Sequence, residues 1–508
     1  MQIYLKIFDF MKKIYLLRVF GYNGTMKSRI QVAIADIGAG SGRIIRGSFD
    51  GKKLELEEVH RFLNGYVALQ GGRYWDILMI WKEITDGLRK ASSPDAPVSI
   101  SVDTWGADFC EFDASGKLLG LPYSYRDTRT KGMVEKIGKI LGEKEWRQIT
   151  GIQPMDHITV CQLYANKEQL PARFTATKHI LYMADAIHYF LTGIYASDFT
   201  SHSCTAVYDW RAKRFSDSIL TQLGIDGSIF APEQESGTVL GGIAEDVARD
   251  LVLPRAKVVM TGGHDSGLLP MLLPEQNDTC LLNCGTWGVI GYHSGSPHER
   301  TDVFVNFGAA GGGYLVCKIF NAMWYLQECK RQWDLNGQGL TYSQLEESAT
   351  ASTYEGIFDV EAPCFSDSTD MAGAIIEYMK RTGQPEPGSH GDFTRAILRS
   401  IALQCAVTLS VFEQEAGKCF KRFYFAGGAN RNHLFCRMLA DITGKELIIG
   451  TSEATAYANG CVQLAALGEL KMSDIPGFAE KETTISPENY SPETSVEKYL
   501  ELRENGGL

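Results

Sequence analysis

The stretch Gln31-Val-Ala-Ile-Ala-Asp36-Ile-Gly38-Ala-Gly40-Ser41-Gly42-Arg43 decides the fold of this 508-residue chain. Its apolar part, 31–37, predicts a buried strand; the glycines that follow predict a tight turn, and 43–49 predicts a second strand. Glycines let a backbone turn tightly and bring its N–H groups close to an anion. The stretch therefore predicts a β-hairpin whose tip is suited to a phosphate.

Side chains around this turn fit the same interpretation. Ser41 adds a hydroxyl donor, and Arg43 adds a rigid cationic fork. Asp36, near the end of the strand, can hold Mg²⁺ directly or through water, because hard cations prefer oxygen ligands. An ordinary hairpin, with glycines serving geometry alone, explains the same residues. The stretch is neither a Walker A loop, since GxxxxGK[ST] is missing, nor a dinucleotide-binding fingerprint, since a strand follows it.

Outward from this hairpin, strand and helix patterns alternate, and the order strand, glycine turn, strand returns near residue 284. The predicted helices are 77–90 and 393–415, and the further predicted strands are 53–61, 97–102, 256–260, 280–283, 289–293 and 422–426. Alternating strands and helices indicate an α/β fold with mixed sheets.

The repeat predicts two similar domains, which suits a chain of this length because single domains usually have roughly 50 to 250 residues. We place an N-terminal extension outside the fold at 1–29, a first domain at 30–268 and a second at 269–508. The charged, proline-interrupted residues after about 472 predict a tail packed on the surface.

Composition excludes several classes of function. The chain has 61 acidic and 50 basic residues and a net charge of −11. An acidic chain without a basic tract argues against binding of nucleic acid or of an anionic membrane surface. No apolar stretch approaches the roughly 20 residues of a membrane span. Charged residues also interrupt every apolar run of the first 25 residues, which argues against a signal peptide. We expect a cytoplasmic protein.

The twelve cysteines are scattered through apolar segments and form no CxxC pair. This predicts free thiols in a reducing compartment instead of disulfides. Cys280 and Cys284 have no nearby His or third Cys, so we discount a zinc site.

A carboxylate follows the strand 256–260, in Gly262-Gly263-His264-Asp265-Ser266. Asp265 at this position can accept the proton of an attacking hydroxyl. In phosphoryl transfer such a base mainly orients the nucleophile, because the transition state is loose and positioning dominates. Capping of a following helix is the simpler role, and the two are compatible.

Two glycine turns stand in the second half. Cys284-Gly285-Thr286-Trp287-Gly288 can present N–H groups and the Thr286 hydroxyl to a phosphate from the opposite side of a cleft; a plain hairpin is the alternative. Gly427-Gly428-Ala-Asn430-Arg431 can seat a flat nucleoside against bare backbone, or be a simple turn from strand to helix.

Carboxylates, arginine and aromatic rings gather in Asp103-Thr-Trp105-Gly106-Ala-Asp108-Phe and in Tyr123-Ser-Tyr-Arg126-Asp. A polyhydroxylated ligand needs this combination of bidentate hydrogen bonds and stacking surface. A buried tryptophan beside an ion-paired loop is the alternative.

Taken together, these motifs resemble the FGGY carbohydrate kinases. They occur in the family's order over about 30–490: a first phosphate hairpin at 36–43, a base at Asp265, a second hairpin at 284–288 and an adenosine turn at 426–430. Within the family they are most similar to the rhamnulokinases, on residues 36–43, 60–65, 75–76, 103–109, 125–129, 150–153, 263–265, 285–287 and 324–327.

The resemblance implies an actin-like, ribonuclease H-type α/β fold of two duplicated domains with the active site in the cleft between them. The first domain would bind sugar and the second nucleotide. It implies transfer of the γ-phosphate of ATP, with Mg²⁺, to the 1-hydroxyl of L-rhamnulose in rhamnose catabolism. An L-fuculose or other ketose kinase, and a non-catalytic sugar-sensing protein on the same fold, remain alternatives. Monomer and homodimer both stay open.

The resemblance also implies roles for single residues. Asp265 is the expected general base and Asp36 the expected neighbour of Mg²⁺. Ser266 stands where the family has Thr, and Ile319 where it has Asn, so that Asn321 is the expected substitute beside the nucleotide. The remaining expected contacts are Trp105, Gly106, Asp108, Arg126, His264 and Ser266 for the sugar, Ala39, Gly40, Ser41, Gly42, Arg43, Gly285 and Thr286 for the phosphates, and Gln327, Gly427 and Gly428 for the nucleotide.

Overall fold

The structure is a computed structural model that describes residues 29–92, 96–251, 256–274, 278–295, 312–365, 368, 370–478, 483–488 and 496–504, with the backbone of 304–307 and 493–495. The predicted N-terminal extension lies outside these residues except for Arg29.

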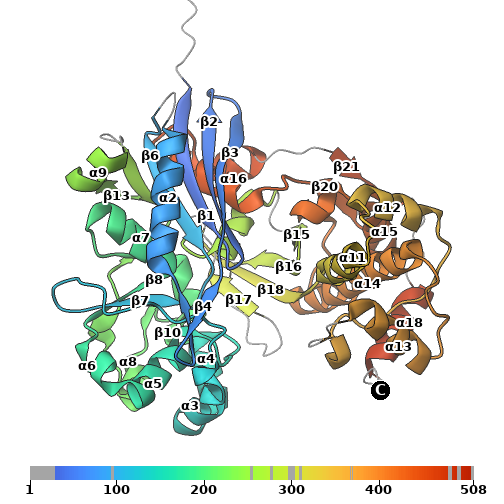
Figure 1. The fold of residues 1–508 in the computed structure, drawn as a ribbon, viewed down its shortest axis with the longest axis horizontal. Coiled ribbons are helices and arrows are strands. Elements are labelled where there is room, and N and C mark those ends of the chain that lie inside the picture. Colours follow the sequence, from blue (N-terminus) through green and yellow to red (C-terminus); the bar gives the residue numbers. More distant parts are fainter. Residues whose placement is uncertain are drawn as a thin grey trace, which may run out of the picture.

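The first half is built on a six-stranded mixed sheet with β1 near its centre (Figure 1). β1 pairs antiparallel with β2 and parallel with β6, and the hairpin β1–β2 is the one that the opening motif predicts. The strands, in sheet order, are β13 (Thr238–Gly242), β14 (Lys257–Met260), β6 (Ser99–Thr104), β1 (Ile30–Ile37), β2 (Ser41–Phe49) and β3 (Leu54–Leu63).

The second half repeats this sheet. From β18 to β21 the strands have the same order and the same relative directions as from β3 to β13, with β17 added at the edge. They are β17 (Phe304–Phe307), β18 (Tyr314–Asn321), β16 (Trp287–Ser294), β15 (Thr279–Cys284), β19 (Arg422–Ala426), β20 (Glu446–Ile449) and β21 (Thr483–Ile485). The predicted duplication and the α/β class are confirmed.

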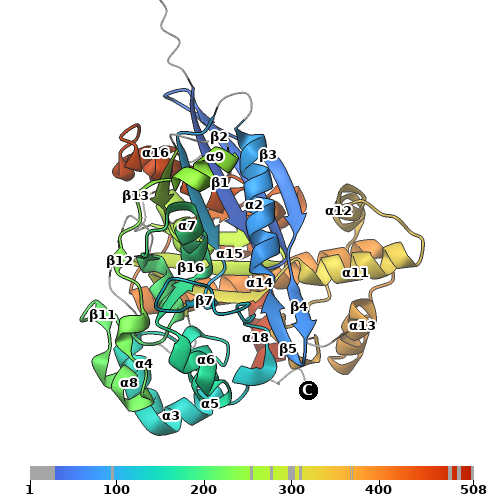
Figure 2. The same ribbon diagram turned by 60° about the vertical axis from the view of Figure 1, so that its left-hand side comes forward.

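One face of the first sheet is covered by helices of its own half. α2 (Ile77–Ala91) buries Ile77, Ile80, Ile84 and Leu88, as the helical spacing predicts, and the Asp76 carboxylate caps it by accepting from Met79 N at 2.9 Å. α7 (Met183–Thr192) and α9 (Glu245–Leu251) belong to the same side (Figure 2).

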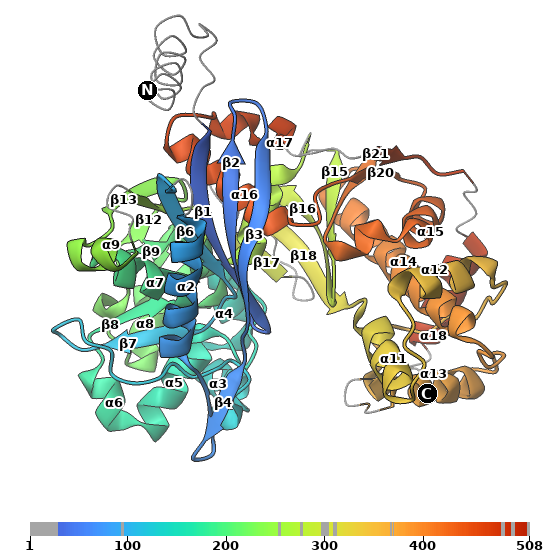
Figure 3. The same cartoon turned by 45° about the horizontal axis from the view of Figure 1, so that its top comes forward.

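The other face is covered by α16 (Ala454–Ala466), which belongs to the second half of the chain and packs against β1, β6 and β3 (Figure 3). Gly460 permits the close approach, because a Cβ there would lie 2.9 Å from Leu54 Cδ2. Gln463 Nε2 donates to Ala33 O at 3.0 Å, and Asn459 Nδ2 donates to Asp103 Oδ2 at 2.6 Å. The two halves therefore share a buried interface with polar contacts inside it.

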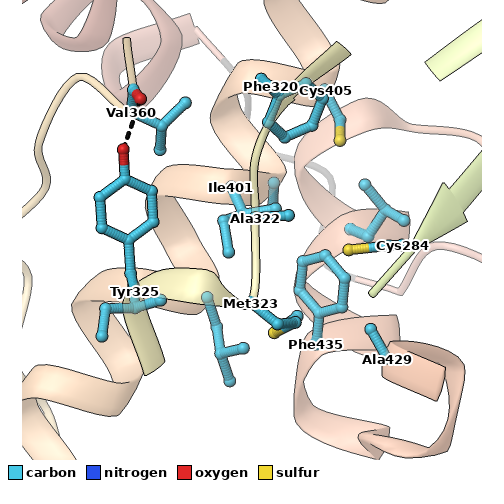
Figure 4. Close-up of a cluster of buried hydrophobic side chains, with 14 of the residues drawn as sticks. Cys284, Phe320, Ala322, Met323, Tyr325, Val360, Ile401, Cys405, Ala429 and Phe435 are labelled. Carbon is cyan, nitrogen blue, oxygen red and sulfur yellow. Dashed lines mark hydrogen bonds between the residues drawn. The ribbon is translucent and has the colours of Figure 1, made fainter. Parts of the chain in front are cut away.

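The second half has its core around the long helix α14 (His390–Ala416). This helix is apolar and long enough to cross a membrane by length and composition, but 72% of its most apolar window is buried inside the fold. In Figure 4 its residues Ile401 and Cys405 lie near Cys284 and Phe435, and Tyr325 donates to Val360 O at 2.5 Å. The other helices are α11 (Trp324–Leu335), α12 (Tyr342–Ala351), α13 (Met371–Arg381) and α15 (His433–Thr443).

Residues 109–230 add a helical block with its own apolar core around Trp146, which the sequence patterns did not predict. A protruding hairpin, β4–β5, precedes α2. The elements are β4 (Tyr66–Leu69), β5 (Gly72–Trp75), β7 (Phe109–Phe112), α3 (Met133–Leu141), α4 (Glu143–Thr150), α5 (Thr159–Gln169), α6 (Pro171–Ala176), β8 (His179–Tyr182), β9 (Ser197–Asp198), η2 (Phe199–Cys204), β10 (Tyr208–Asp209), β11 (Arg214–Phe215), α8 (Asp217–Leu223) and β12 (Glu233–Gln234).

As predicted, most described side chains after about 472 are exposed or partly exposed, but the segment also forms secondary structure that the sequence patterns did not predict. β21 extends the second sheet, and α17 (Ile475–Phe478) packs against the interface core. Tyr499 in α18 (Glu493–Glu504) is fully buried, and its hydroxyl donates to Gln404 Oε1 at 2.9 Å. The buried apolar surface of Ile475 and Tyr499 outweighs the high local charge.

Replacing Asn459 tests the polar contact between the halves. Asn459→Ala removes the hydrogen bond to a fully buried carboxyl, and we expect the free energy of unfolding in urea to fall by roughly 1–3 kcal/mol. Thr455→Ala, on the same helix but partly exposed, is the matched control and should change little. Equal stabilities of the two variants would contradict the argument.

Candidate active site

The first glycine turn is anchored at its base and open at its tip. Gly38 N donates to Ser41 O at 2.9 Å. Asn64 anchors the turn with two hydrogen bonds: its side-chain Nδ2 donates to Gly38 O, and its backbone N–H donates to Gly40 O. A Cβ on Gly40 would meet nothing within 4 Å, whereas one on Gly42 would lie 2.2 Å from Phe62. The turn thus has free space on the side of Gly40, as a phosphate-binding hairpin needs.

Arg43 lies between two carboxylates. It donates to Asp36, its cross-strand partner, and to Glu453, which stands at the N-terminus of α16. Burial raises the pKa of Asp36, and Glu453 adds to this, although Arg43 opposes it. The guanidinium therefore joins the hairpin of the first half to a helix of the second.

Asp103 is fully buried next to this group and is the parallel-register partner of Asp36. Its Oδ2 accepts from Asn459, while its Oδ1 has no hydrogen-bond partner among the described residues. Burial and the Asp36 carboxylate raise its pKa well above the usual range. The carboxyl groups of Asp36, Asp103 and Glu453 outnumber the cation between them, Arg43, and this excess suits a bound divalent cation.

Asp265 is the first residue of α10 (Asp265–Leu268), directly after the strand β14 and the turn 261–264. Its side chain is 42% exposed, and its Oδ1 accepts from Ser266 N at 2.6 Å and lies 3.6 Å from His264 Nε2. Burial raises its pKa and His264 lowers it, with a net rise. A carboxyl with a raised pKa is a stronger base than an ordinary one.

His264 follows β14 and lies beside the end of β6 and beside η2. It bridges to Thr104, its backbone N–H donates to Thr200 Oγ1 at 3.2 Å, and its Nε2 lies 3.1 Å from Ser266 Oγ. Burial disfavours its charge, but the Cys204 thiol group and the carboxylates of Asp265 and Asp198 outweigh burial and raise its pKa to about 9. The site thus holds a cation next to Asp265.

Trp105 and Trp75 form an aromatic wall with ring centroids 4.3 Å apart. Both indole N–H groups donate to Asp108 Oδ2, at 2.9 and 2.5 Å, and Gln162 Nε2 donates to its Oδ1 at 2.7 Å. Asp108 is fully buried, and burial raises its pKa to about 6. The structure therefore places Asp108 behind the wall, where it orients both rings.

Arg126 lies at the rim of this wall. Its Nε donates to the Tyr125 hydroxyl at 3.1 Å, and its guanidinium lies 5.3 Å from the centroid of that ring. Tyr125 N in turn donates to Asp108 at 3.0 Å, so the arginine is linked to the same buried carboxylate.

The second glycine turn is held by the start of α11. Ala322 N and Trp324 N donate to Thr286 O, and Met323 N donates to Gly285 O. The Thr286 hydroxyl donates to Gln327 Oε1 at 3.0 Å, and Gly285 has open space where a Cβ would be. This turn has no charged side chain, in contrast to the first.

Gly427 packs against this turn, because a Cβ on it would lie 2.6 Å from Asn283 Oδ1 and from Cys284 O; its φ of +86° also requires glycine. Gly428 is open on its outer side. Asn321 ends β18, opposite Trp287. Gly285, Thr286, Gln327, Asn321, Gly427 and Gly428 thus form one group in the second half.

The predicted residues fall into two such groups, one for each half. In the first half, Asp36 and the turn 38–43 lie on one side of Asp103, and Trp105, Gly106, His264, Asp265 and Ser266 follow the ends of β6 and β14. Sequence reasoning missed Glu453, Asn459 and Cys204. Only Glu453 carried a signal, an acidic residue ahead of the alanine-rich run 454–458.

Comparison with known proteins fits this arrangement. Residues 32–268 match the N-terminal domain, and residues 280–468 the C-terminal domain, of the FGGY family of carbohydrate kinases. A rhamnulokinase of Halalkalibacterium halodurans is 32% identical over 445 residues, which cover 86% of this chain and 93% of that protein. The chain belongs to the FGGY family of carbohydrate kinases. It is therefore a sugar kinase, and the resemblance that the motifs indicate is confirmed.

Other relatives of this FGGY kinase agree. A rhamnulokinase of Bacteroides thetaiotaomicron is 30% identical over 452 residues, which cover 88% of this chain and 92% of that protein. The fold matches a xylulose kinase from Rhodospirillum rubrum with a TM-score of 0.78 at 18% identity, over 94% of this chain and 98% of that one. A gluconate kinase from Lactobacillus acidophilus matches with a TM-score of 0.75 at 15% identity, over 94% and 97%.

Enzymes of this family use ATP, generally with Mg²⁺, and the residues present fit both. The open faces of Gly40, Gly285 and Gly428 leave room for phosphates and a nucleoside beside bare backbone. Asp36 and the unpartnered Oδ1 of Asp103 supply the oxygen ligands that Mg²⁺ prefers, directly or through water. In the described part of the chain no cluster of three or more His, Cys, Asp or Glu could hold a metal by itself.

Asp108→Asn tests the role of the buried carboxylate. The new amide N–H₂ would face a donor, either an indole N–H or Gln162, whose Oε1 is already used by Arg129. We expect a loss of roughly 1–3 kcal/mol in urea unfolding, together with altered tryptophan fluorescence. Asp246→Asn, exposed on α9, is the control. Unchanged stability and fluorescence would show that Asp108 does not hold the indoles.

Proposed function

We propose that this kinase transfers the γ-phosphate of ATP to the 1-hydroxyl of L-rhamnulose, as an enzyme of rhamnose catabolism in the cytoplasm. The observation that carries the proposal is the Asp265 carboxylate, half-exposed at the start of α10 and next to His264. The 30–32% identity to several rhamnulokinases over most of the chain supports the choice of sugar.

Binding of the sugar would use the first half. Trp105 offers a ring face to the C–H side of the sugar, and His264, Ser266 and Arg126 offer hydrogen-bond donors. Gly106 packs directly against Cys204 and His264, since a Cβ on it would lie 2.4 Å from Cys204 Sγ, and its backbone is what it would offer to the sugar. Asp108 contributes from behind by orienting Trp105 and Trp75, a positioning role in place of the direct contact that the resemblance implies.

The proton of the 1-hydroxyl would pass to Asp265 as its oxygen bonds to the γ-phosphorus and the bond to ADP breaks. The raised pKa of Asp265 favours that transfer. The positive charge of His264 would stabilise the negative charge that develops nearby in the transition state. Mg²⁺, held near Asp36, would neutralise the phosphate oxygens. The amides of both glycine turns, with Arg43 and Thr286, would fix the phosphates from two sides.

L-Fuculose differs from L-rhamnulose only in stereochemistry, and it remains the second candidate sugar. The observation that separates both from a non-catalytic sugar sensor is that Asp36, Arg43, Asp265 and Thr286 are all present and lie in the two groups described above.

Coupled measurement of ADP release with L-rhamnulose, L-fuculose, L-ribulose, D-xylulose and glycerol tests the function. We expect L-rhamnulose to have the highest kcat/KM. A higher kcat/KM for L-fuculose would keep the mechanism and change the substrate. ADP release that no sugar accelerates would overturn the proposal in favour of the sugar sensor.

Asp265→Asn tests the base. We expect kcat to fall by about 10²–10⁴-fold while sugar binding, measured by calorimetry, persists. Asp113→Asn, on an exposed turn, is the matched control. The base must be deprotonated, so kcat/KM of the wild type should fall as pH drops through the pKa of Asp265, which lies above that of an ordinary Asp. The acid limb should vanish in the variant. Near-normal kcat would exclude Asp265 as the base.

A further inference from the structure

We propose that Cys204 is a modification site, a thiol that reacts with small electrophiles, and that an adduct on its sulfur blocks the sugar side of the active site. The first part rests on the exposure of the sulfur and on its contact with His264. The second part rests on the proposed function, since it takes Gly106 and His264 as sugar contacts.

Cys204 is one of three cysteines that are not buried. All twelve are free thiols, as the sequence predicts, and nine of them are buried. Cys364 and Cys419 are exposed, and Cys204, at the end of η2, is partly exposed. Burial raises the pKa of Cys364 despite the nearby Arg381. Reaction with a small electrophile in the native state is therefore limited by access to these three thiols.

Cys204 also has a cationic partner in direct contact. Its Sγ lies 3.8 Å from Nδ1 and 4.0 Å from Nε2 of His264, and 3.9 Å from Ser203 Oγ. Burial opposes ionisation of the thiol, but the imidazolium outweighs it and lowers the pKa of Cys204, while Asp265 acts in the opposite direction. A thiolate beside a protonated imidazole, with access to solvent, is the environment of a reactive cysteine.

The sulfur lies against the residues that the resemblance assigns to the sugar. A Cβ on Gly106 would be 2.4 Å from Cys204 Sγ and 3.2 Å from His264 Cδ2, so the thiol and the imidazole together face the backbone of Gly106. An adduct on Sγ adds atoms at this point. Because Sγ already packs against Gly106 and His264, these atoms would displace His264, whose neighbour is Asp265.

The reaction with iodoacetamide, used as the probe, is a simple substitution. The thiolate sulfur attacks the carbon that bears iodine, an S–C bond forms as the C–I bond breaks, and iodide leaves. The thiol proton stays on His264. No oxidant or further reactant is needed.

The test uses the full chain with the two exposed thiols removed by Cys364→Ser and Cys419→Ser. The native protein is treated with iodoacetamide, and intact and peptide mass spectrometry identify the modified residue. We expect one adduct, on Cys204, and parallel loss of sugar-dependent ADP release. A Cys204→Ser variant of this background should take up no adduct under the same conditions.

Protection by substrate tests the second part. At a sugar concentration about ten times its dissociation constant, we expect labelling of Cys204 to slow roughly tenfold, since only the free enzyme reacts. ATP alone should protect less. A labelled protein that keeps full ADP release would overturn the blocking step, even if Cys204→Ser itself is inactive.

The outcomes separate this inference from the proposed function. If a sugar is phosphorylated but Cys204 stays unlabelled while denatured protein labels readily, the modification site is wrong and the function stands. If Cys204 labels but no sugar is phosphorylated, the proposed function fails and the reactive thiol stands.

Discussion

The docking of α16 onto the first sheet is the contact on which the rest of the structure depends. A helix from the second half of the chain covers β1 and β6 of the first half, with Gly460 against Leu54. Inside this apolar interface, Asn459 and Gln463 make hydrogen bonds that only one register of the helix allows. Buried polar groups are costly when unpaired, so these contacts fix how the helix lies on the sheet.

The same helix connects the interface to the chemistry. Glu453, the N-cap of α16, accepts a hydrogen bond from Arg43 of the first hairpin, and six residues later Asn459 donates to Asp103, the register partner of Asp36. A displacement of α16 would therefore move two hydrogen-bond partners together: Glu453, the partner of Arg43, and Asn459, the partner of Asp103. In addition to the effect of burial, Asp36 and Asp265 raise the pKa of Asp103, and Asp36 raises the pKa of Asp265. A divalent cation among them would reverse that repulsion.

Much of this could be predicted from the sequence where the signal was local. The strands around Asp36 and the helix 77–91 follow from apolar runs and spacing, and the repeated strand–turn–strand order predicted the duplicated sheet. Contacts between distant residues left no such signal. Glu453 is 410 residues from Arg43. Asp108 is fully buried, but its neighbours in the sequence do not distinguish it from a carboxylate that faces a ligand. The charges after about 472 predicted a tail packed on the surface. They gave no sign that Tyr499 is buried, because the pocket around it is built by α14 and residues 359–360.

The duplication also explains why the two glycine turns differ. Both join equivalent strands, β1 to β2 and β15 to β16, so the fold by itself would give the two turns the same role. Only the first is followed by an arginine and preceded by a carboxylate, and only the second is closed by a helix that starts directly behind it. The charged turn is suited to phosphate and metal. The neutral turn can offer only amides and the Thr286 hydroxyl to a phosphate, and it lies next to Gly427 and Gly428, which suit the nucleoside. The catalytic asymmetry therefore comes from a few side chains placed on a symmetric scaffold, which is where sequence alone already pointed to function.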